Sequence, residues 1–358
     1  MTFEEARAQF PVFERYAYLN AGTNGPLARP TVVAMLAQER ADLESGRGGY
    51  PYFERALELR EQVRGKLAAT VGVEPEELSL ATSTTSGCNI VLAGLGLGPD
   101  DEVVTTDGEH FGLLGAIAAS PARVRVAPVR ELPPEESLEA LRREVTPRTR
   151  LFALSHVSWM TGTRFPVEEL REATGLPVLV DGAQSVGVIP VDATRVDYYA
   201  FSCQKWLCGP DVTGGLVVRE PDSLAVAAPS YLSQEDYEPT GKFTPRAGAA
   251  RYDSNWTPVP ALAGLDAALD LAPEWRFERA AAAAARCREL LAERVEVVTA
   301  PHQGTLVTFQ ADGDSTELVR RLYDQGVVVR EIPGMGWIRV SCGWWTSDED
   351  LERLVSAL

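Results

Sequence analysis

Short apolar runs alternate with longer amphipathic segments through the middle of the chain. Four of these runs are predicted to be buried strands, because each is short and is bounded by polar residues. The strands cover Glu102–Thr106, Val124–Val129, Arg150–Ser155 and Pro177–Val180, and the helical patterns between them cover Phe111–Ala119, Glu135–Glu144 and Val167–Thr174. Strands that alternate with helices predict an α/β fold with a mostly parallel central sheet covered on both faces.

The rest of the pattern divides the chain into three parts. Residues 1–25 are an N-terminal segment expected to pack on the functional site, residues 26–260 a large domain, and residues 261–358 a smaller α+β domain. The smaller domain begins with a helical pattern, Ala261–Arg294, which is broken near Pro273. Beyond it, strand patterns occur at Val295–Ala300, Gly304–Gln310, Val327–Ile332 and Trp337–Cys342, and helical patterns at Ser315–Gln325 and from Asp348. In the large domain, Thr213–Val218 is expected to be a strand reversed relative to its neighbours, and Pro229–Asn255 is irregular.

Two neighbouring strand patterns end in reactive side chains. The run Val178–Val180 stops at Asp181, and Tyr198–Phe201 runs into a polar turn that contains Lys205. In a parallel sheet the ligand lies beyond the carboxyl ends of the strands, so these two side chains face the same crevice. Pyridoxal phosphate (PLP) needs a lysine amine to bind it and an acid to hold its ring nitrogen protonated. Taken alone, the two residues fit a structural ion pair equally well.

A hydroxyl-rich turn follows an earlier strand pattern. Leu78–Ala81 runs into the serines and threonines of residues 82–86, and an apolar helix pattern begins there. A helix N-terminus offers free backbone N–H groups and a positive dipole end, which together bind anions such as phosphate. A single serine or threonine cap is the commonplace alternative. The run of hydroxyls exceeds what one cap needs, which favours an anion site.

These motifs together resemble a known family. DGAQS at residues 181–185, FSCQKWLCGP at 201–210 and the glycine pair at 214–215 resemble the PLP site of the aminotransferase class V family. That family includes cysteine desulfurases, isopenicillin N epimerase-like proteins and C–S lyases. The resemblance extends from about Tyr18 to the last helix. It implies the PLP-dependent transferase fold, type I, with PLP as the cofactor.

The resemblance also implies how the cofactor is held. Lys205 is expected to form the Schiff base and then to act as the base at Cα, Asp181 to stabilise the protonated ring, and His110 to stack on the ring and relay protons. The other expected cofactor contacts are Gln184 on the phenolic oxygen, Thr84 and Thr85 on the phosphate, and Ser202 and Gln204 beside them. His156 also matches a family motif but is expected to be structural.

Substrate contacts and a partner follow from the same resemblance. Arg339, in an R-x-S pattern before the last helix, is expected to bind the substrate α-carboxylate, with Arg330 a weaker second choice. Asn20 lies in the segment YLNAGTNGP, which resembles the family's entry segment, and is expected to contact substrate. Thr257 is expected to reach the phosphate in a second subunit, which implies a homodimer.

Two departures from the family pattern bear on the reaction. Trp159 stands where the desulfurases have an asparagine on the cofactor's phenolic oxygen, and residues 331–336 lack the cysteine that carries a persulfide. A persulfide-forming desulfurase is therefore disfavoured. The sequence favours an aminotransferase or C–S lyase acting at Cα of an amino acid, with an epimerase or racemase second. A catalytically silent PLP-binding protein remains the alternative from another class, and the substrate side chain stays open.

Composition removes several other classes. The net charge of −17 argues against nucleic acid or an anionic membrane as partner. The five cysteines show no spacing typical of a metal site, so no metal is expected. The start MTFEEARAQF lacks the features of a signal peptide and no run approaches the ~20 apolar residues of a membrane helix, so a cytoplasmic protein is expected. No GxGxxG motif supports a dinucleotide fold.

Overall fold

A seven-stranded sheet forms the centre of the large domain in the computed structural model, which describes residues 1–358. The strand order is β2-β8-β7-β6-β5-β3-β4, and all neighbours are parallel except β8, which is antiparallel to both β7 and β2. The strands are β2 (Leu78–Ala81), β3 (Glu102–Thr106), β4 (Arg123–Ala127), β5 (Thr149–Ser155), β6 (Val178–Asp181), β7 (Tyr198–Ser202) and β8 (Gly214–Val218). The predicted mostly parallel sheet and the reversed strand are confirmed.

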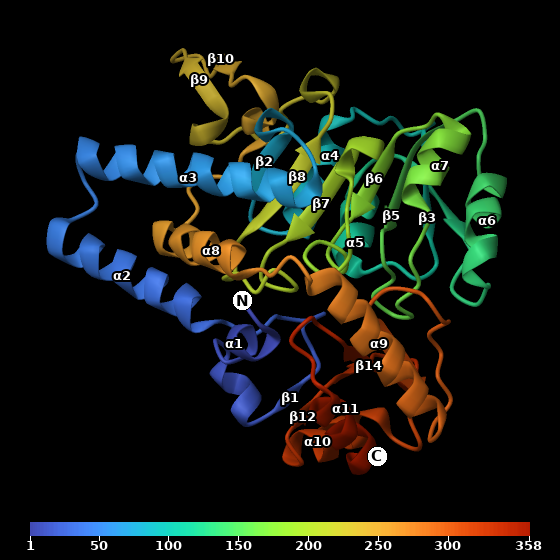
Figure 1. Cartoon of the computed structure of the whole chain (residues 1–358). Coiled ribbons are helices and arrows are strands. Elements are labelled where there is room, and N and C mark those ends of the chain that lie inside the picture. Colours follow the sequence, from blue (N-terminus) through green and yellow to red (C-terminus); the bar gives the residue numbers. More distant parts are fainter.

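Helices cover both faces of this sheet (Figure 1). Along β6, Val178 and Val180 face a core shared with α3, α6, α7 and α8, whereas Leu179 faces a core shared with α4 and α5. This alternation is why the strands read as continuous apolar runs, since both faces of each central strand are buried. The helices are α2 (Arg29–Ser45), α3 (Tyr50–Val71), α4 (Thr84–Gly94), α5 (Phe111–Ala119), α6 (Ser137–Arg143), α7 (Val167–Thr174) and α8 (Val259–Leu271).

The smaller domain packs below the large one in Figure 1. Its antiparallel sheet has the order β11-β14-β13, and the N-terminal strand β1 pairs with β12 in parallel, so the first residues of the chain join the last ones. The elements are α1 (Phe3–Arg7), β1 (Ala17–Tyr18), α9 (Arg276–Ala292), β11 (Leu306–Gln310), α10 (Ser315–Asp324), β12 (Val327–Val328), β13 (Arg330–Ile332), β14 (Trp337–Ser341) and α11 (Asp348–Ala357).

Three details differ from the sequence prediction or add to it. Residues 295–300 do not form a strand but only an isolated bridge between Val297 and Phe309. The segment expected to be irregular contains a hairpin of β9 (Gln234–Tyr237) and β10 (Phe243–Pro245). Short 3-10 helices occur at Pro11–Glu14, Pro75–Glu77, Pro134–Glu136, Ala193–Arg195, Pro221–Ser223, Tyr231–Ser233 and Gly248–Tyr252. None of the helices combines the length and the apolar character needed to cross a bilayer.

Candidate active site

A polar cavity of about 240 Å³ opens at the carboxyl ends of β5, β6 and β7. Only two of its 16 lining residues are hydrophobic, so it suits a charged ligand. The last residues of the three strands, Ser155, Asp181 and Ser202, line its floor, and Arg330 and Arg339 enter it from the smaller domain. The cavity therefore lies where ligands bind in open α/β sheets, closed over by the second domain.

Lys205 and Asp181 both line this cavity. Asp181 ends β6 and Lys205 follows the end of β7, and these two strands are hydrogen-bonded neighbours. Burial lowers the pKa of Lys205 to about 8, opposed by the charge of Asp181 and reinforced by Arg339 and Arg330. Burial raises the pKa of Asp181, while Lys205 and the Ala183 amide, which donates to Oδ1 at 2.9 Å, act in the opposite direction. A lysine with a lowered pKa can exchange protons near neutral pH.

The hydroxyl turn lies at one end of the cavity. Ser83 caps α4, while the next residue, Thr84, is held against β7 because its amide donates to Ser202 Oγ at 2.9 Å and the two hydroxyls are 2.8 Å apart. Ser83, Thr84, Thr85 and Ser202 all line the cavity together with Gln204. None of these side chains is charged. Anion binding at this end therefore rests on hydroxyls, amides and the N-terminal dipole of α4.

His110 and Trp159 form a second wall. His110 caps α5, and its Nδ1 accepts from the Gly112 amide at 3.0 Å, which leaves the proton on Nε2 in the neutral ring. Burial, with Lys205, lowers the pKa of His110. The Trp159 ring lies edge-on to His110, with centroids 5.3 Å apart and planes at 88°. The buried Nε1 of Trp159 has no hydrogen-bond partner in the protein.

Gln184 and Gln204 differ in how far the protein uses their amides. Gln184 Nε2 donates to the Gly22 carbonyl at 2.9 Å and its Oε1 accepts from Trp206 at 3.0 Å, so one N–H remains for a ligand. The Oε1 of Gln204 is buried beside the cavity without a partner. Exchange of the two ends of this amide would direct an N–H₂ donor to the same place. Gln204 therefore has hydrogen-bonding capacity that no protein group satisfies.

Two arginines converge on one hydroxyl at the other end of the cavity. Arg330 and Arg339 are directly opposed across β13 and β14. Arg330 Nη1 and Arg339 Nη2 both donate to Thr23 Oγ1, at 3.2 and 3.3 Å, and Arg339 Nη1 also donates to the Trp159 carbonyl at 3.1 Å. Burial, with Arg330, lowers the pKa of Arg339 to about 9. Neither guanidinium has a carboxylate within 4.0 Å among the ion pairs of the protein, so both are available to anions.

Glu109, beneath the cavity, is an acid that the sequence patterns did not single out. Its carboxylate accepts from Thr106 Oγ1 at 2.6 Å, Ser155 Oγ at 2.5 Å and the Ser155 amide at 3.1 Å. Burial raises the pKa of Glu109 to about 7, and the charge of Asp181 adds to this shift. Glu109 thus joins the end of β3 to the end of β5, and it positions Ser155 in the floor of the cavity.

Comparison with known proteins identifies the family. The family model described as Aminotransferase class-V matches residues 19–354. The chain belongs to this family. Isopenicillin N epimerase of Streptomyces clavuligerus is 30% identical, with 99% of this chain and 97% of that protein covered, and a probable cysteine desulfurase of Pseudomonas aeruginosa is 31% identical, with 98% and 96% covered.

Two solved structures of the enzyme C-DES agree with this assignment. A mutant with glycine covalently linked to its PLP cofactor has a TM-score of 0.90 and 30% identity, covering 98% of both chains. The cystine C–S lyase C-DES in complex with its product cysteine persulfide also has a TM-score of 0.90, with 31% identity, covering 97% of this chain and 98% of that one. The predicted family and the type I fold are confirmed, and the chain is a class V PLP-dependent enzyme.

The residues of the cavity fit this cofactor. An amine and a carboxylate stand at adjacent strand ends, an uncharged hydroxyl cradle lies at a helix N-terminus, and Gln204 Oε1 and Arg339 Nε are buried there without partners. Of the residues expected from the class V pattern, the structure brings nine to the cavity: Lys205, Asp181, His110, Gln184, Thr84, Thr85, Ser202, Gln204 and Arg339. Their individual roles stay predictions.

Two expected site residues do not line the cavity. Asn20 lies behind Thr23, whose hydroxyl donates to Asn20 Oδ1 at 2.8 Å, so it acts on the site through another side chain. Thr257 is buried and does not line the cavity of its own chain. Conversely, Arg330, the weaker second choice for the substrate carboxylate, lines the cavity, and so does Thr23, which no sequence motif singles out. The only feature of the sequence that points to a cavity position for Thr23 is its place in the Asn-rich entry turn.

No cysteine lines the cavity. All five cysteines are buried free thiols, and burial raises the pKa of Cys203, the one nearest to Lys205 in sequence, to about 12. The structure contains no group of three or more His, Cys, Asp or Glu side chains arranged to hold a metal ion. His156 is buried, with its Nδ1 2.8 Å from the Tyr199 hydroxyl, and it does not line the cavity.

Proposed function

We propose that the protein is a C–S lyase that removes a sulfur group from Cβ of an amino acid with a second carboxylate, of the cystine class. The observation that carries this proposal is the pair Arg330 and Arg339. These residues are opposed on adjacent strands, both line the polar cavity, and neither guanidinium is paired with a carboxylate. One α-carboxylate satisfies one of them, because a guanidinium fork binds a carboxylate with two hydrogen bonds. A second carboxylate on the same substrate satisfies the other.

Lys205, Asp181 and His110 carry the proton chemistry in this proposal. Lys205 and the hydroxyl cradle would hold PLP, which would supply the sink for the electron pair left when Cα loses its proton. Asp181 would accept a hydrogen bond from the protonated ring nitrogen and so favour the positively charged ring. The Lys205 amine takes the Cα proton, which its lowered pKa permits near neutral pH. His110 presents the flat ring that restrains the cofactor.

The elimination then balances without any further reagent except water. The pair from the Cα–H bond forms the Cα–Cβ double bond, while the Cβ–S bond breaks and its electron pair leaves on sulfur. The proton on Lys205 is delivered to the departing sulfur. The remaining three-carbon fragment takes up water and is released as pyruvate and ammonia. With cystine as substrate, the sulfur product is cysteine persulfide.

The lining of the cavity favours this chemistry over that of a persulfide-forming desulfurase. A desulfurase needs a protein thiol at the substrate sulfur, and none of the five cysteines lines the cavity. The structural similarity to the cystine C–S lyase C-DES, which holds over 97% of this chain, also supports the lyase.

An amino-acid epimerase is the second candidate. It is supported by the 30% identity to an isopenicillin N epimerase over 99% of this chain. His110 lines the cavity beside Lys205 and offers the second proton-transfer group that inversion at Cα needs.

A product assay separates these activities. The loaded enzyme is mixed with cystine, or with other L-amino acids one at a time, without a keto-acid acceptor. We expect pyruvate, ammonia and a persulfide in repeated turnovers, and none from the Lys205→Ala variant. One equivalent of a keto acid with an intact carbon skeleton contradicts the lyase and indicates an aminotransferase. Recovery of the D-isomer indicates the epimerase, and no change with any amino acid indicates a silent binding protein.

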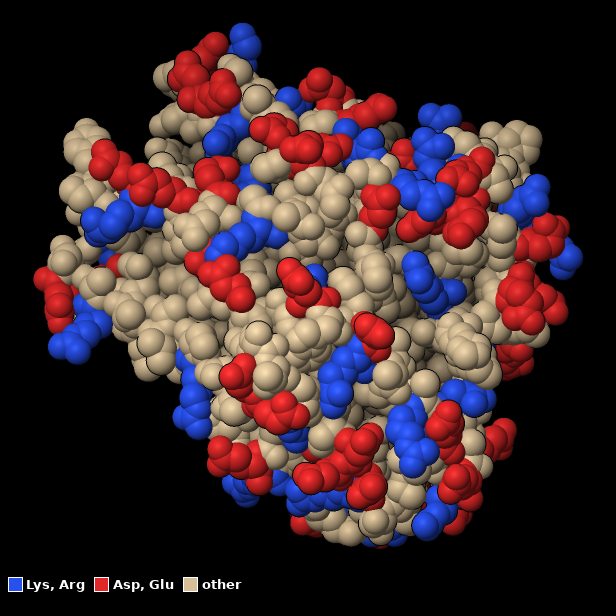
Figure 2. All heavy atoms as spheres, in the orientation of Figure 1, with Lys and Arg blue, Asp and Glu red and all other residues tan.

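We also propose that the enzyme is a homodimer formed through α2 and the start of α3. Eight of the 17 exposed large apolar side chains lie in these elements or, in the case of Leu27, just before α2, and the face over the middle of α2, at the left of Figure 2, is mostly uncharged. The eight are Leu27, Val32, Val33, Leu36, Leu43, Tyr50, Phe53 and Leu57. A patch of this kind is typical of a protein interface. A second copy of the chain is the partner that we propose for this face, because its cavity could also receive Thr257.

A further inference from the structure

The hydroxyl of Thr23 makes three hydrogen bonds, which use its whole capacity. It donates to Asn20 Oδ1 at 2.8 Å and accepts from Arg330 at 3.2 Å and from Arg339 at 3.3 Å. A hydroxyl has one donor and two acceptor lone pairs, so nothing remains for a ligand. Thr23 lines the cavity but cannot itself bind substrate through this oxygen without releasing an arginine.

The side chains of Arg330 and Arg339 would separate without the Thr23 hydroxyl that binds both. Like charges directly opposite each other on antiparallel strands repel, and no carboxylate lies close enough to either guanidinium to offset the repulsion. An aspartate at position 23 would hold both arginines but would also neutralise them. Threonine holds them through an uncharged oxygen and leaves both positive charges for a ligand. The backbone leaves room for this arrangement, because a Cβ on Gly22 would lie 2.9 Å from Arg339 Nη2.

The two arginines depend on Thr23 to different degrees. Arg339 is buried, and the Trp159 carbonyl holds it independently at 3.1 Å. Arg330 is only half-buried, and its one side-chain hydrogen bond in the protein is to Thr23. Loss of the hydroxyl therefore frees Arg330 to turn into solvent, while Arg339 stays in place. The effect falls on one of the two anion sites.

We propose that Thr23 is a specificity-determining positioning residue, which holds Arg330 at the distance from Arg339 that suits a substrate with two carboxylates. This inference rests on the proposed function, because it assigns the two arginines to two carboxylates of one substrate. It also gives Asn20 a role behind the site, since Asn20 fixes the direction of the Thr23 O–H bond.

The test compares Thr23→Val, which keeps the branched shape and removes the hydroxyl, with Thr23→Ser, which keeps the hydroxyl. We expect Thr23→Val to lower kcat/KM for cystine about tenfold, mainly through KM, since Arg330 loses its one side-chain hydrogen bond while Arg339 keeps its bond to the Trp159 carbonyl. For S-methylcysteine, which has a single carboxylate, we expect a change of less than about twofold in the same variant. Thr23→Ser restores the preference for cystine.

A binding measurement removes the dependence on turnover. Calorimetry on the loaded enzyme compares glutarate, a dicarboxylate, with valerate, its single-carboxylate counterpart. We expect Thr23→Val to reduce the preference for glutarate by the same factor as the preference for cystine. The matched control is Thr105→Val, which removes a fully buried hydroxyl that has no hydrogen-bond partner and does not line the cavity.

The outcomes distinguish this inference from the proposed function. If the wild-type enzyme prefers neither cystine over S-methylcysteine nor glutarate over valerate, the two-carboxylate substrate is wrong and the role of Thr23 is wrong with it. If the wild type shows both preferences and Thr23→Val retains them, the proposed function stands and the role of Thr23 is overturned. If Thr23→Val weakens both ligands of each pair equally, Thr23 is structural only.

Discussion

Lys205 is the residue whose ionisation the cavity most directly controls. Burial is the largest cause of its lowered pKa, and two arginines from the smaller domain add to the effect while Asp181 opposes it. An ordinary lysine, with a pKa of 10.5, is almost entirely protonated at neutral pH, whereas a pKa of about 8 leaves a useful neutral fraction. The smaller domain therefore tunes the reactive group of the large one.

The pH dependence of cofactor attachment tests this control. Attachment needs the neutral amine, so the rate of PLP binding to the apo-protein should rise with pH, with its midpoint at about 8. Arg330→Met removes a charge that lowers the pKa of Lys205, so it should move the midpoint to higher pH. The measurement is stopped-flow absorbance of the lysine-bound cofactor. Arg195→Met, which removes a surface arginine paired with Glu168, should leave the midpoint unchanged. An equal shift in both variants would count against the proposed electrostatics.

The sequence identified single site residues well wherever a strand end carried them. Lys205, Asp181 and Ser202 follow predicted strands, and the parallel topology alone brings their side chains to one edge. Thr23 and Asn20 show the limit. Both lie in the same turn, and which of them reaches the cavity depends on how that turn packs against β13 and β14, which no local pattern encodes.

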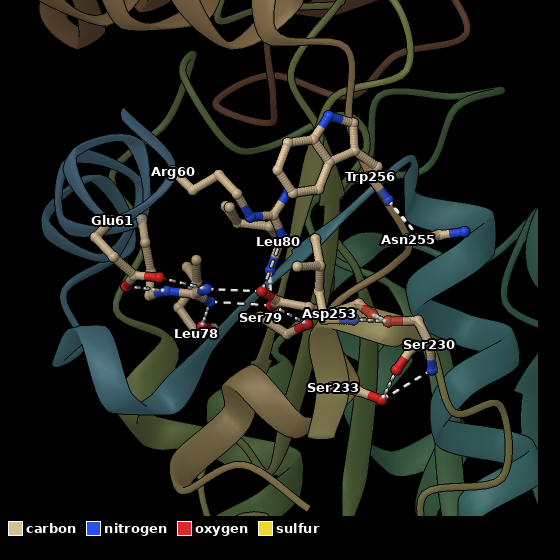
Figure 3. Close-up of polar contacts among 12 residues, drawn as sticks. Arg60, Glu61, Leu78, Ser79, Leu80, Ser230, Ser233, Asp253, Asn255 and Trp256 are labelled. Atoms are coloured by element: carbon tan, nitrogen blue, oxygen red, sulfur yellow. Dashed lines mark hydrogen bonds and ion pairs between the residues drawn. The ribbon is translucent and has the colours of Figure 1, made fainter. Parts of the chain in front are cut away.

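At the scale of elements, α3 is tied to the segment that leads to α8 by one buried carboxylate. Asp253 accepts hydrogen bonds from Arg60 at 3.0 Å, from Arg64 at 2.7 and 3.0 Å, from Ser79 Oγ at 3.2 Å and from the Leu80 amide at 2.9 Å (Figure 3). Its side chain has no exposure to solvent. Two arginines on α3 therefore share this carboxylate, although Arg64 also pairs with Glu61. Asp253 also holds the start of the loop that carries Thr257.

Removal of this carboxylate should destabilise the protein strongly. Asp253→Asn keeps the shape but leaves the buried Arg60 without a counter-charge and Arg64 with only the half-exposed Glu61, and we expect unfolding to become easier by about 3–5 kcal/mol. The measurement is chemical denaturation of the apo-protein. The control is Glu44→Gln, which breaks the exposed Arg40–Glu44 pair on α2 and should cost less than about 1 kcal/mol. Similar losses of unfolding free energy in the two variants would show that the Asp253 network contributes no more to stability than an exposed ion pair.

The errors of element prediction have identifiable causes. Residues 295–300 have the apolar character of a strand, but they contribute only a bridge because Val298 and Thr299 both donate to the single residue Thr308 instead of extending a ladder. The β9–β10 hairpin was missed because its residues are polar and largely exposed, so no alternation of apolar residues marks them. The reversed strand β8 was predicted correctly because turn signals precede it and follow it.

At the scale of the whole molecule, the apolar face over α2 and the position of Thr257 make one combined prediction. Within one chain this face stays exposed, with Val33 at 65% and Leu36 at 59% of full exposure, while Thr257 lies outside its own cavity. If a second copy covers the face and receives Thr257, then breaking the dimer should also weaken the hold on the cofactor phosphate. Neither effect alone would link the surface to the site.

Leu36→Glu tests both effects together. A charge in the centre of the face is costly to bury, so we expect light scattering to give the mass of one 38.9 kDa chain and equilibrium titration to give weaker PLP binding. Val124→Glu places the same charge on a 46%-exposed side chain of the edge strand β4 and should change neither quantity. A wild-type protein that is already monomeric contradicts the dimer. A Leu36→Glu monomer with unchanged PLP affinity keeps the interface but contradicts the role of Thr257, because the phosphate would then be held by the residues of a single chain.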